Sequence, residues 1–272
     1  MLPWDGAPSR EQEEFTLDDT IILEVRDGAA LITLNRPAAG NACNAELAAR
    51  LIGVWDELER NDAVRAVVVT GAGNRHFCTG VDMKGASESS NAGFDRWPDI
   101  PETFLKPVIC AINGVVAGGG WHLVWQSDFA ISAPTATFLE PHVSVGWVPL
   151  REMLGLGMRA AQGPIRRMAY MGTAERMDAE RAYQLGIVTE IVAADALVEH
   201  AMKIAATIAR QAPLAVSLQK EAFQRAFDMR FTSREMYGHM HEKRVRVDWE
   251  SEDGREGPKA FAEKRAPVWK GR

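Results

Sequence analysis

Two glycine-containing loops carry the residues in this chain whose types and spacing suit catalysis. The first covers residues 77–82 (FCTGVD) and the second residues 113–122 (NGVVAGGGWH), and each follows a short apolar segment. Glycines at a helix start let the backbone approach a ligand and leave N–H groups pointing at it, where the helix dipole adds partial positive charge. One N–H from each loop would form a two-donor pocket for an oxygen that gains negative charge. We expect an oxyanion hole, and the alternative is a glycine turn that only lets elements pack.

Two histidines are the leading acid/base candidates. His122 lies one turn into the helix that the glycines open, and His142 follows residues 138–141 (FLEP). Histidine titrates close to neutral pH, so each is competent as a general acid or base. In an extended segment Glu140 would share a face with His142, where a carboxylate would fix the imidazole tautomer and raise its basicity. The alternatives are two hydrogen-bonded structural histidines and a glutamate that faces solvent.

The elements that must position these residues alternate between strand and helix. Residues 21–26 and 29–34 predict a hairpin around the Asp27-Gly28 turn, and Asn44 predicts the N-cap of a following helix. Further apolar strands are expected at 66–70, 107–112 and 129–132, and the chain is mostly helical after Pro149. This order predicts an α/β protein built from stacked βαβ-like turns.

Composition and charge exclude several classes of function. The chain has 272 residues and a formal net charge of -6, so bulk electrostatics gives no support for nucleic-acid or anionic-membrane binding. No apolar run is long enough to span a bilayer. Cys43, Cys78 and Cys110 lack metal-ligand spacing, so we expect no metal site and a reducing, cytoplasmic location. Residues 1–19 are polar and acidic, which predicts a flexible tail rather than a signal peptide.

The two loops together resemble the crotonase (enoyl-CoA hydratase/isomerase) superfamily. The patterns FCTGVD and KPVICAINGVVAGGG carry the likeness, supported by Asn35-Arg36-Pro37 and by AFAEKR at 260–265, and it extends from about Ile21 to Trp269. The resemblance implies an α/β spiral of repeated ββα units. It also implies an oxyanion hole that binds the carbonyl of a coenzyme A thioester, with Thr79 and Gly119 at the donor positions.

The resemblance also implies how the chain is organised and where coenzyme A binds. Residues 20–195 would form the spiral core with the acyl-CoA site, and residues 196–272 a helical region for trimerisation and CoA contact. The protein would be a homotrimer or a dimer of trimers, with the CoA thioester as substrate and no tightly bound cofactor. The expected CoA contacts are Arg36, Cys78, Val81, Asp82, Met83, Lys84, Phe261 and Lys264.

Several neighbouring residues have two interpretations. Residues 85–93 (GASESSNAG) form either a lid over the acyl group or a surface connection. Arg151 and Glu152 follow Pro149 at an expected helix start, and each either enters the acyl pocket or stays exposed. Four tryptophans either shape a pocket for a bulky acyl chain or belong to the core: Trp97, Trp121, Trp125 and Trp147.

One departure from the family decides the functional prediction. Hydratases of the family carry glutamates at the positions of His122 and His142. We expect an acyl-CoA-processing lyase or isomerase of the enoyl-CoA hydratase type, in fatty acid metabolism, with a neutral histidine acid/base pair in place of the two glutamates. Such a pair also suits C–C bond hydrolysis of a cyclic 3-oxoacyl-CoA or ketone. The loss of both glutamates leaves a non-catalytic acyl-CoA-binding scaffold as the third possibility.

Overall fold

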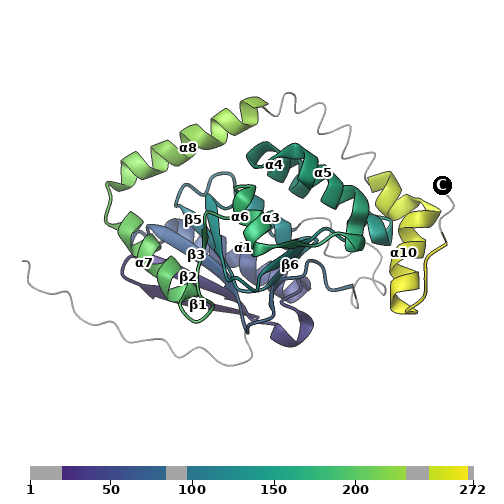
Figure 1. Ribbon diagram of the computed structural model, residues 1–272. Helices are drawn as coiled ribbons and strands as arrows, with labels where there is room; N and C mark the ends of the chain where they lie inside the picture. The colour runs from purple at the N-terminus through teal and green to yellow at the C-terminus, as the bar shows by residue number, and fades with distance from the viewer. Residues whose placement is uncertain (1–19, 84–96, 231–244, 269–272) are drawn as a thin grey trace, which may run out of the picture.

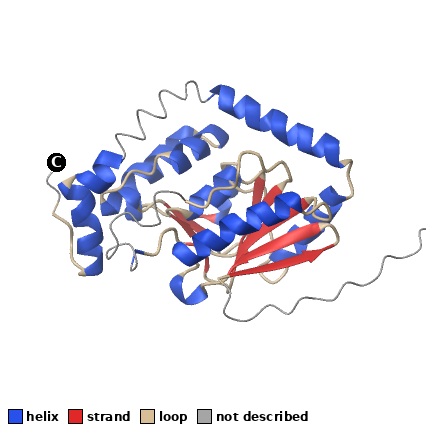
Figure 2. Cartoon of the chain, turned by 180° about the vertical axis from the view of Figure 1, so that it is seen from behind, coloured by secondary structure: helices blue, strands red, loops and turns tan. Residues whose placement is uncertain are grey.

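The computed structural model describes residues 20–83, 97–230 and 245–268. The expected N-terminal tail, the candidate lid at 85–93 and Lys84 lie outside these ranges. The described chain is a mixed α/β structure with two sheets, which are surrounded by helices (Figures 1 and 2).

The larger sheet has six strands in the order β1-β2-β3-β5-β7-β10. They span Ile21–Arg26, Ala29–Leu34, Ala66–Gly71, Val108–Ile112, Phe129–Ser132 and Glu190–Ile191. β1 and β2 pair antiparallel, and the remaining neighbours pair parallel. Asp27 (φ 53°) and Gly28 (φ 77°) form the tight turn of the predicted hairpin. The predicted hairpin and strands are therefore confirmed.

Both faces of this sheet are buried, because residues alternate between them along each strand. On β3, Val67 and Val69 face one core and Val68 faces the other. Helix α1 (Ala45–Arg60) covers the first face, and helix α7 (Leu197–Ala209) covers the second. The N-cap prediction for α1 is confirmed, because the Asn44 side chain accepts a hydrogen bond from the Leu47 N–H.

The smaller sheet has the order β4-β6-β8-β9, with strands at His76–Cys78, Val115–Ala117, Thr137–Leu139 and Met177–Asp178. Each turn of the chain sends one strand to the large sheet and the next to the small sheet: β3 then β4, β5 then β6, β7 then β8. Helix α3 (Gly120–Gln126) follows β6 directly. This is the predicted spiral of ββα units. Because β4 and β6 run parallel, the two glycine loops that follow them lie at the same edge.

The second half of the chain is mostly helical, as expected. The α-helices are α4 (Arg151–Arg159), α5 (Gln162–Met171), α6 (Ala179–Gln184), α8 (Pro213–Arg230) and α10 (Glu252–Ala262). Short helical turns lie at η1 (Pro37–Ala39), η2 (His142–Val145), η3 (Gly172–Ala174) and η4 (Arg246–Glu250). α8 lies along the outside of the molecule, and α10 lies near the C-terminus (Figure 1). No helix in the described part of the chain has the length and apolar character needed to cross a membrane.

Candidate active site

The backbones of the two glycine loops touch each other. Gly80 has φ 92°, and an ideal Cβ on it would lie 2.8 Å from the Gly119 nitrogen. A Cβ on Gly120 would lie 2.3 Å from the carbonyl oxygen of Cys78. Side chains therefore cannot replace these glycines, because the loops approach closer than a Cβ allows.

The expectation for Thr79 needs correction. Its backbone N–H donates to the Gly40 carbonyl at 3.2 Å, and its hydroxyl donates to the same oxygen at 3.1 Å. The Thr79 N–H is therefore engaged inside the protein, and it does not point at the space between the loops.

Val81 is the residue of the first loop whose N–H is directed away from Cys43. The backbone N–H of Cys43 donates to the Gly80 carbonyl at 2.7 Å, and the backbone N–H of Asp82 donates to the Cys43 carbonyl at 2.9 Å. These bonds flank Val81 in a parallel bridge with Cys43, so the Val81 N–H points to the opposite side. The adjacent Gly80 contacts Gly119, the N-cap of α3, and the first N–H groups of a helix have no partner within it.

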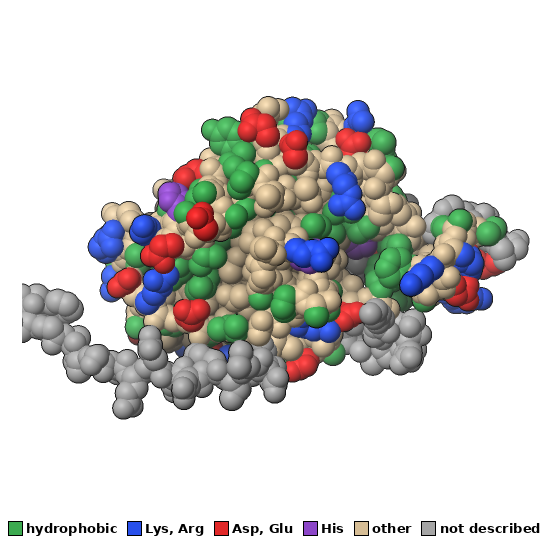
Figure 3. Space-filling view, turned by 60° about the horizontal axis from the view of Figure 1, so that its bottom comes forward, with side chains coloured by type: hydrophobic (Ala, Val, Ile, Leu, Met, Phe, Trp, Pro, Cys, Tyr) green, Lys and Arg blue, Asp and Glu red, His purple; other side chains and the backbone are tan. Residues whose placement is uncertain are grey.

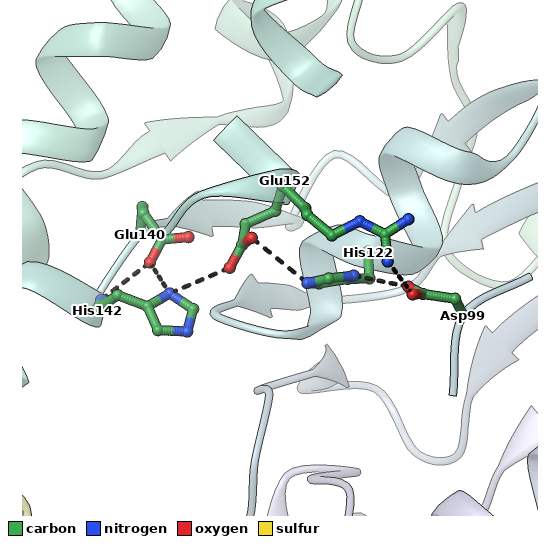
Figure 4. A network of polar contacts seen from close by, with 6 residues as sticks. Asp99, His122, Glu140, His142 and Glu152 are labelled. Atoms are coloured by element: carbon green, nitrogen blue, oxygen red, sulfur yellow. Dashed lines mark hydrogen bonds and ion pairs between the residues drawn. The ribbon is translucent and has the colours of Figure 1, made fainter. Parts of the chain in front are cut away.

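The two histidines belong to one network of contacts between acidic and basic side chains (Figure 4). His122 Nδ1 is 2.8 Å from Asp99 Oδ1, and its Nε2 is 3.4 Å from Glu152 Oε2. The other oxygen of Glu152 is 3.5 Å from His142 Nδ1. Glu152 therefore bridges the two imidazoles, and Asp99 holds the far nitrogen of His122.

Glu140 and Arg151 lie at the two ends of this network. One Glu140 oxygen contacts His142 Nδ1 and also accepts the backbone N–H of His142 at 2.9 Å. The second ring nitrogen of His142 points away from both glutamates (Figure 4). An ideal Cβ on Gly118 would lie 3.7 Å from His142 Cε1, so this edge of the ring lies beside the glycine loop. At the other end, Arg151 Nη1 is 2.5 Å from Asp99 Oδ2.

Four different segments deliver these side chains. Asp99 lies in the loop before β5, His122 in α3, His142 at the start of η2, and the consecutive Arg151 and Glu152 in the first turn of α4. Helices α3 and α4 pack against each other, which brings Glu152 between the histidines.

The surroundings make His122 a cation. Burial lowers its pKa, but the contacts with Asp99 and Glu152 outweigh burial and raise the pKa to about 9. Burial raises the pKa of Glu152, and its contacts with His122 and then His142 lower it to about 2. Burial also opposes ionisation of Asp99, whose pKa is nevertheless lowered by His122 and Arg151. This differs from the expected neutral imidazole, because two carboxylates hold the two nitrogens of His122.

Glu140, His142 and Glu152 are also the only described residues that group as possible metal ligands. One donor atom from each lies within 4.8 Å of the others, and all three residues are buried. A cation would have to replace the hydrogen bond that Glu140 makes with His142 Nδ1. We treat the group as hydrogen-bonded acid/base residues and assign no metal ligand in it.

Two of the four tryptophans lie against the histidines. The Trp97 ring is 5.5 Å from that of His122, and it occupies the space where a Gly119 side chain would be. The Trp147 ring is 6.3 Å from that of His142. These two shape the site.

The other two tryptophans pack further back. Trp121 is fully buried, and its Nε1 donates to the Leu139 carbonyl at 2.9 Å, so it belongs to the core. Trp125 packs against Gly155 of α4 and lies 6.0 Å from the Arg151 guanidinium. Trp125 therefore packs beside Arg151, which lies at one end of the network of polar contacts.

The structure brings part of the expected CoA set together. Arg36 contacts Asp82 at 2.9 Å and donates to the Ala42 carbonyl, so its charge is already paired. Cys78 is fully buried, and burial raises the pKa of its thiol to about 12. Its side chain is therefore not accessible to a ligand. Val81 and Met83 lie in the same loop, both partly exposed.

The C-terminal pair lies elsewhere in the chain. Phe261 is 59% exposed on α10, and Lys264 follows this helix with φ 54°. α10 packs on η2, the turn that begins at His142. This packing puts α10 itself beside the turn that carries His142, and Phe261 is open to a ligand or another surface.

Sequence reasoning missed Asp99. It stands alone in Trp97-Pro98-Asp99-Ile100, with no motif around it, and only the folded chain brings it to His122. Glu152 was expected either in the pocket or exposed, and it is 1% exposed. A hollow on one face of the molecule shows histidine side chains at its floor, between Lys/Arg and apolar patches (Figure 3).

Known proteins share this sequence and fold. The sequence pattern of the enoyl-CoA hydratase/isomerase family matches residues 24–272. An (E)-benzylidenesuccinyl-CoA hydratase from Thauera aromatica is 35% identical over 92% of this chain and 99% of its own. A carnitinyl-CoA dehydratase from Proteus mirabilis is 35% identical over 94% and 100%. The crystal structure of a carnitinyl-CoA hydratase from Mycobacterium avium superposes with a TM-score of 0.82, at 32% identity over 93% and 99%.

Proposed function

The chain belongs to the enoyl-CoA hydratase/isomerase family, and from this premise we propose that it forms and protonates the enolate of an acyl-CoA thioester. The Val81 and Gly119 N–H groups would hold the thioester oxygen, and His142 would move the proton. The relatives act on CoA thioesters as hydratases and dehydratases. We therefore place the reaction among reversible water additions and eliminations.

The orientation of His142 carries this proposal. Its Nδ1 faces Glu140, and its other nitrogen points away from the carboxylates on the side of the glycine loop. A carboxylate on one nitrogen fixes the tautomer in which the opposite nitrogen accepts a proton. In this proposal the base and the two N–H donors would face the same space.

Elimination from a 3-hydroxyacyl-CoA would then run in balanced steps. His142 Nε2 takes the proton from C2, and the electron pair moves to the thioester oxygen, where two N–H groups stabilise it. The enolate collapses as the C3–O bond breaks, and the hydroxide takes a proton from Nε2 to leave as water. Hydration of the enoyl-CoA is the reverse. One imidazole suffices, because the proton that it takes is the proton that it gives.

His122 has a different role in this proposal. Both of its nitrogens face carboxylates, and it is a cation at neutral pH. It therefore holds Glu152 and α3 in place rather than acting on substrate. This replaces the symmetric histidine pair. A non-catalytic scaffold, the alternative, would bind acyl-CoA without turning over any substrate.

CoA binding and assembly complete the proposal. We place the CoA nucleotide along Arg36 and residues 81–84, with Phe261 and Lys264 from the same or a neighbouring subunit of a homotrimer or a dimer of trimers. The support is the matched AFAEKR segment and the exposure of Phe261. The three cysteines are buried thiols, which is compatible with a reducing cytoplasm.

The test is a panel of 3-hydroxyacyl-, 2-enoyl- and cyclic 3-oxoacyl-CoA substrates, with crotonyl-CoA included. We expect turnover of a hydroxyacyl or enoyl member, and a loss of about 10²–10⁴ in His142→Ala. His200→Ala is the matched control, because His200 is 40% exposed and pairs with Glu190. Full turnover in His142→Ala would overturn the role of His142. Cleavage of only the cyclic 3-oxo substrate would favour C–C hydrolysis instead.

A further inference from the structure

We propose that Glu152 is a positioning residue that sets the strength of His142 as a base, and that Asp99 and His122 keep its carboxylate ionised. This rests on the proposed role of His142. Glu152 does not reach solvent, since it is 1% exposed. It acts through the imidazole rather than on the substrate.

The geometry gives His142 two carboxylates where one would fix its tautomer. Glu140 contacts Nδ1 from the preceding segment, and Glu152 Oε1 lies 3.5 Å from the same nitrogen, on α4. Glu140 alone accounts for the orientation of the ring. The second carboxylate adds a negative charge close to Nδ1, and a charge at this distance favours the imidazolium form.

The other residues of this network explain how Glu152 keeps its negative charge. A fully buried carboxylate without a cation would take up a proton. His122 places Nε2 at 3.4 Å from Glu152, and Asp99 holds the opposite nitrogen at 2.8 Å. Arg151 in turn balances Asp99 at 2.5 Å. Each member therefore keeps the next one charged as far as Glu152, whose carboxylate lies beside His142.

Among the described residues, the charged groups nearest to the His142 ring are carboxylates, and the opposing cation of His122 is farther away. Glu140 and Glu152 face the ring directly, and the cation of His122 lies behind Glu152. On the C-terminal side, Asp248 of η4 accepts the Val148 N–H at 3.0 Å. Removing the charge of Glu152 while keeping its shape should make His142 harder to protonate and a weaker base.

The experiment compares wild type with Glu152→Gln by two measurements on the full-length protein. The first is the pH profile of kcat/KM with the panel substrate that turns over. The second is an NMR titration of ¹³C-labelled histidine, with the His142 signal assigned from His142→Gln. In Glu152→Gln the acid limb and the His142 midpoint should move to lower pH by about one unit, with the plateau rate falling about tenfold or more.

Two further variants separate charge from structure. Glu57→Gln makes the same change at a 53%-exposed glutamate and should change neither measurement. Asp99→Asn should shift both in the same direction as Glu152→Gln, by less. An equal loss of rate at every pH with an unmoved His142 midpoint would overturn the proposal. If no acyl-CoA turns over, the proposed function fails, and the NMR titration still decides the role of Glu152.

Discussion

Replacing Asp99 by Asn tests whether the network of polar contacts makes His122 a cation. Asn keeps the size of the side chain and removes its charge, so the ring of His122 loses the closest of its two carboxylates, at 2.8 Å. Against burial, these carboxylates raise the His122 pKa from 6.5 to about 9. That rise is worth about 3 kcal/mol in favour of the charged form.

The sign of the pH dependence follows from the direction of the rise. A group with a raised pKa contributes stability that is complete below its unfolded value and is lost as the pH rises through its folded value. For His122 this window runs from about 6.5 to about 9. The gap in unfolding free energy between wild type and Asp99→Asn should be largest near pH 6, at about 1–3 kcal/mol. Above pH 9 this difference in unfolding free energy should fall to the contribution of the contact between Asp99 and Arg151, which is under about 1 kcal/mol.

Urea unfolding at intervals between pH 5 and pH 10 measures this gap, and a histidine NMR titration follows the ring itself. Asp56→Asn is the control, since Asp56 is 59% exposed and pairs only loosely with Arg60 at 4.0 Å. Its gap from wild type should stay small and constant. The reasoning is refuted if the Asp99→Asn gap does not change between pH 6 and pH 10, or if His122 in that variant still titrates near pH 9.

Three substitutions test the scaffold around the site. Gly80→Ala puts a Cβ 2.8 Å from the Gly119 nitrogen at φ 92°, so turnover of the panel substrate should fall by about 10² or more. Lys220→Met removes a cation that is 4% exposed and lies 3.0 Å from Asp128, which should cost about 3 kcal/mol in urea unfolding. Gly257→Ala puts a Cβ 1.8 Å from a backbone oxygen of η2, and the displacement of α10 should cost about 1–3 kcal/mol by the same assay. Wild-type values in any of the three would contradict the packing described.

The fold was predictable where the backbone itself imposes the pattern. The Asp27-Gly28 turn and the Asn44 cap act through neighbouring residues, so their sequence signals survive in the structure. The choice of the proposed oxyanion donor was not of this kind. Thr79 and Val81 stand on either side of Gly80, and only the Gly40 carbonyl, 39 residues away from Thr79, takes one N–H and leaves the other.

The candidate site shows the same division. Glu140 is two residues from His142, and the predicted pair forms, but through a turn rather than an extended segment. Pro141 between them is helical (φ -86°, ψ -10°), and Glu140 accepts the backbone N–H of His142. Asp99 and Glu152 reach His122 from 23 residues before it and from the next helix. No local pattern marks Asp99, and the helix start after Pro149 left open whether Glu152 is buried in the site. Their contacts depend on how α3 and α4 pack, which the sequence does not state.

The position of negative charge links the site to its family. The family resemblance implies glutamates where this chain has two histidines, and three carboxylates lie within contact of the imidazoles: Asp99, Glu140 and Glu152. In the proposed reaction the negative charge therefore lies one group behind the imidazole that faces substrate. An imidazole backed by buried carboxylates can still remove a proton from carbon, but it changes charge as it does so. We therefore expect the rate to depend on carboxylates that do not touch the substrate.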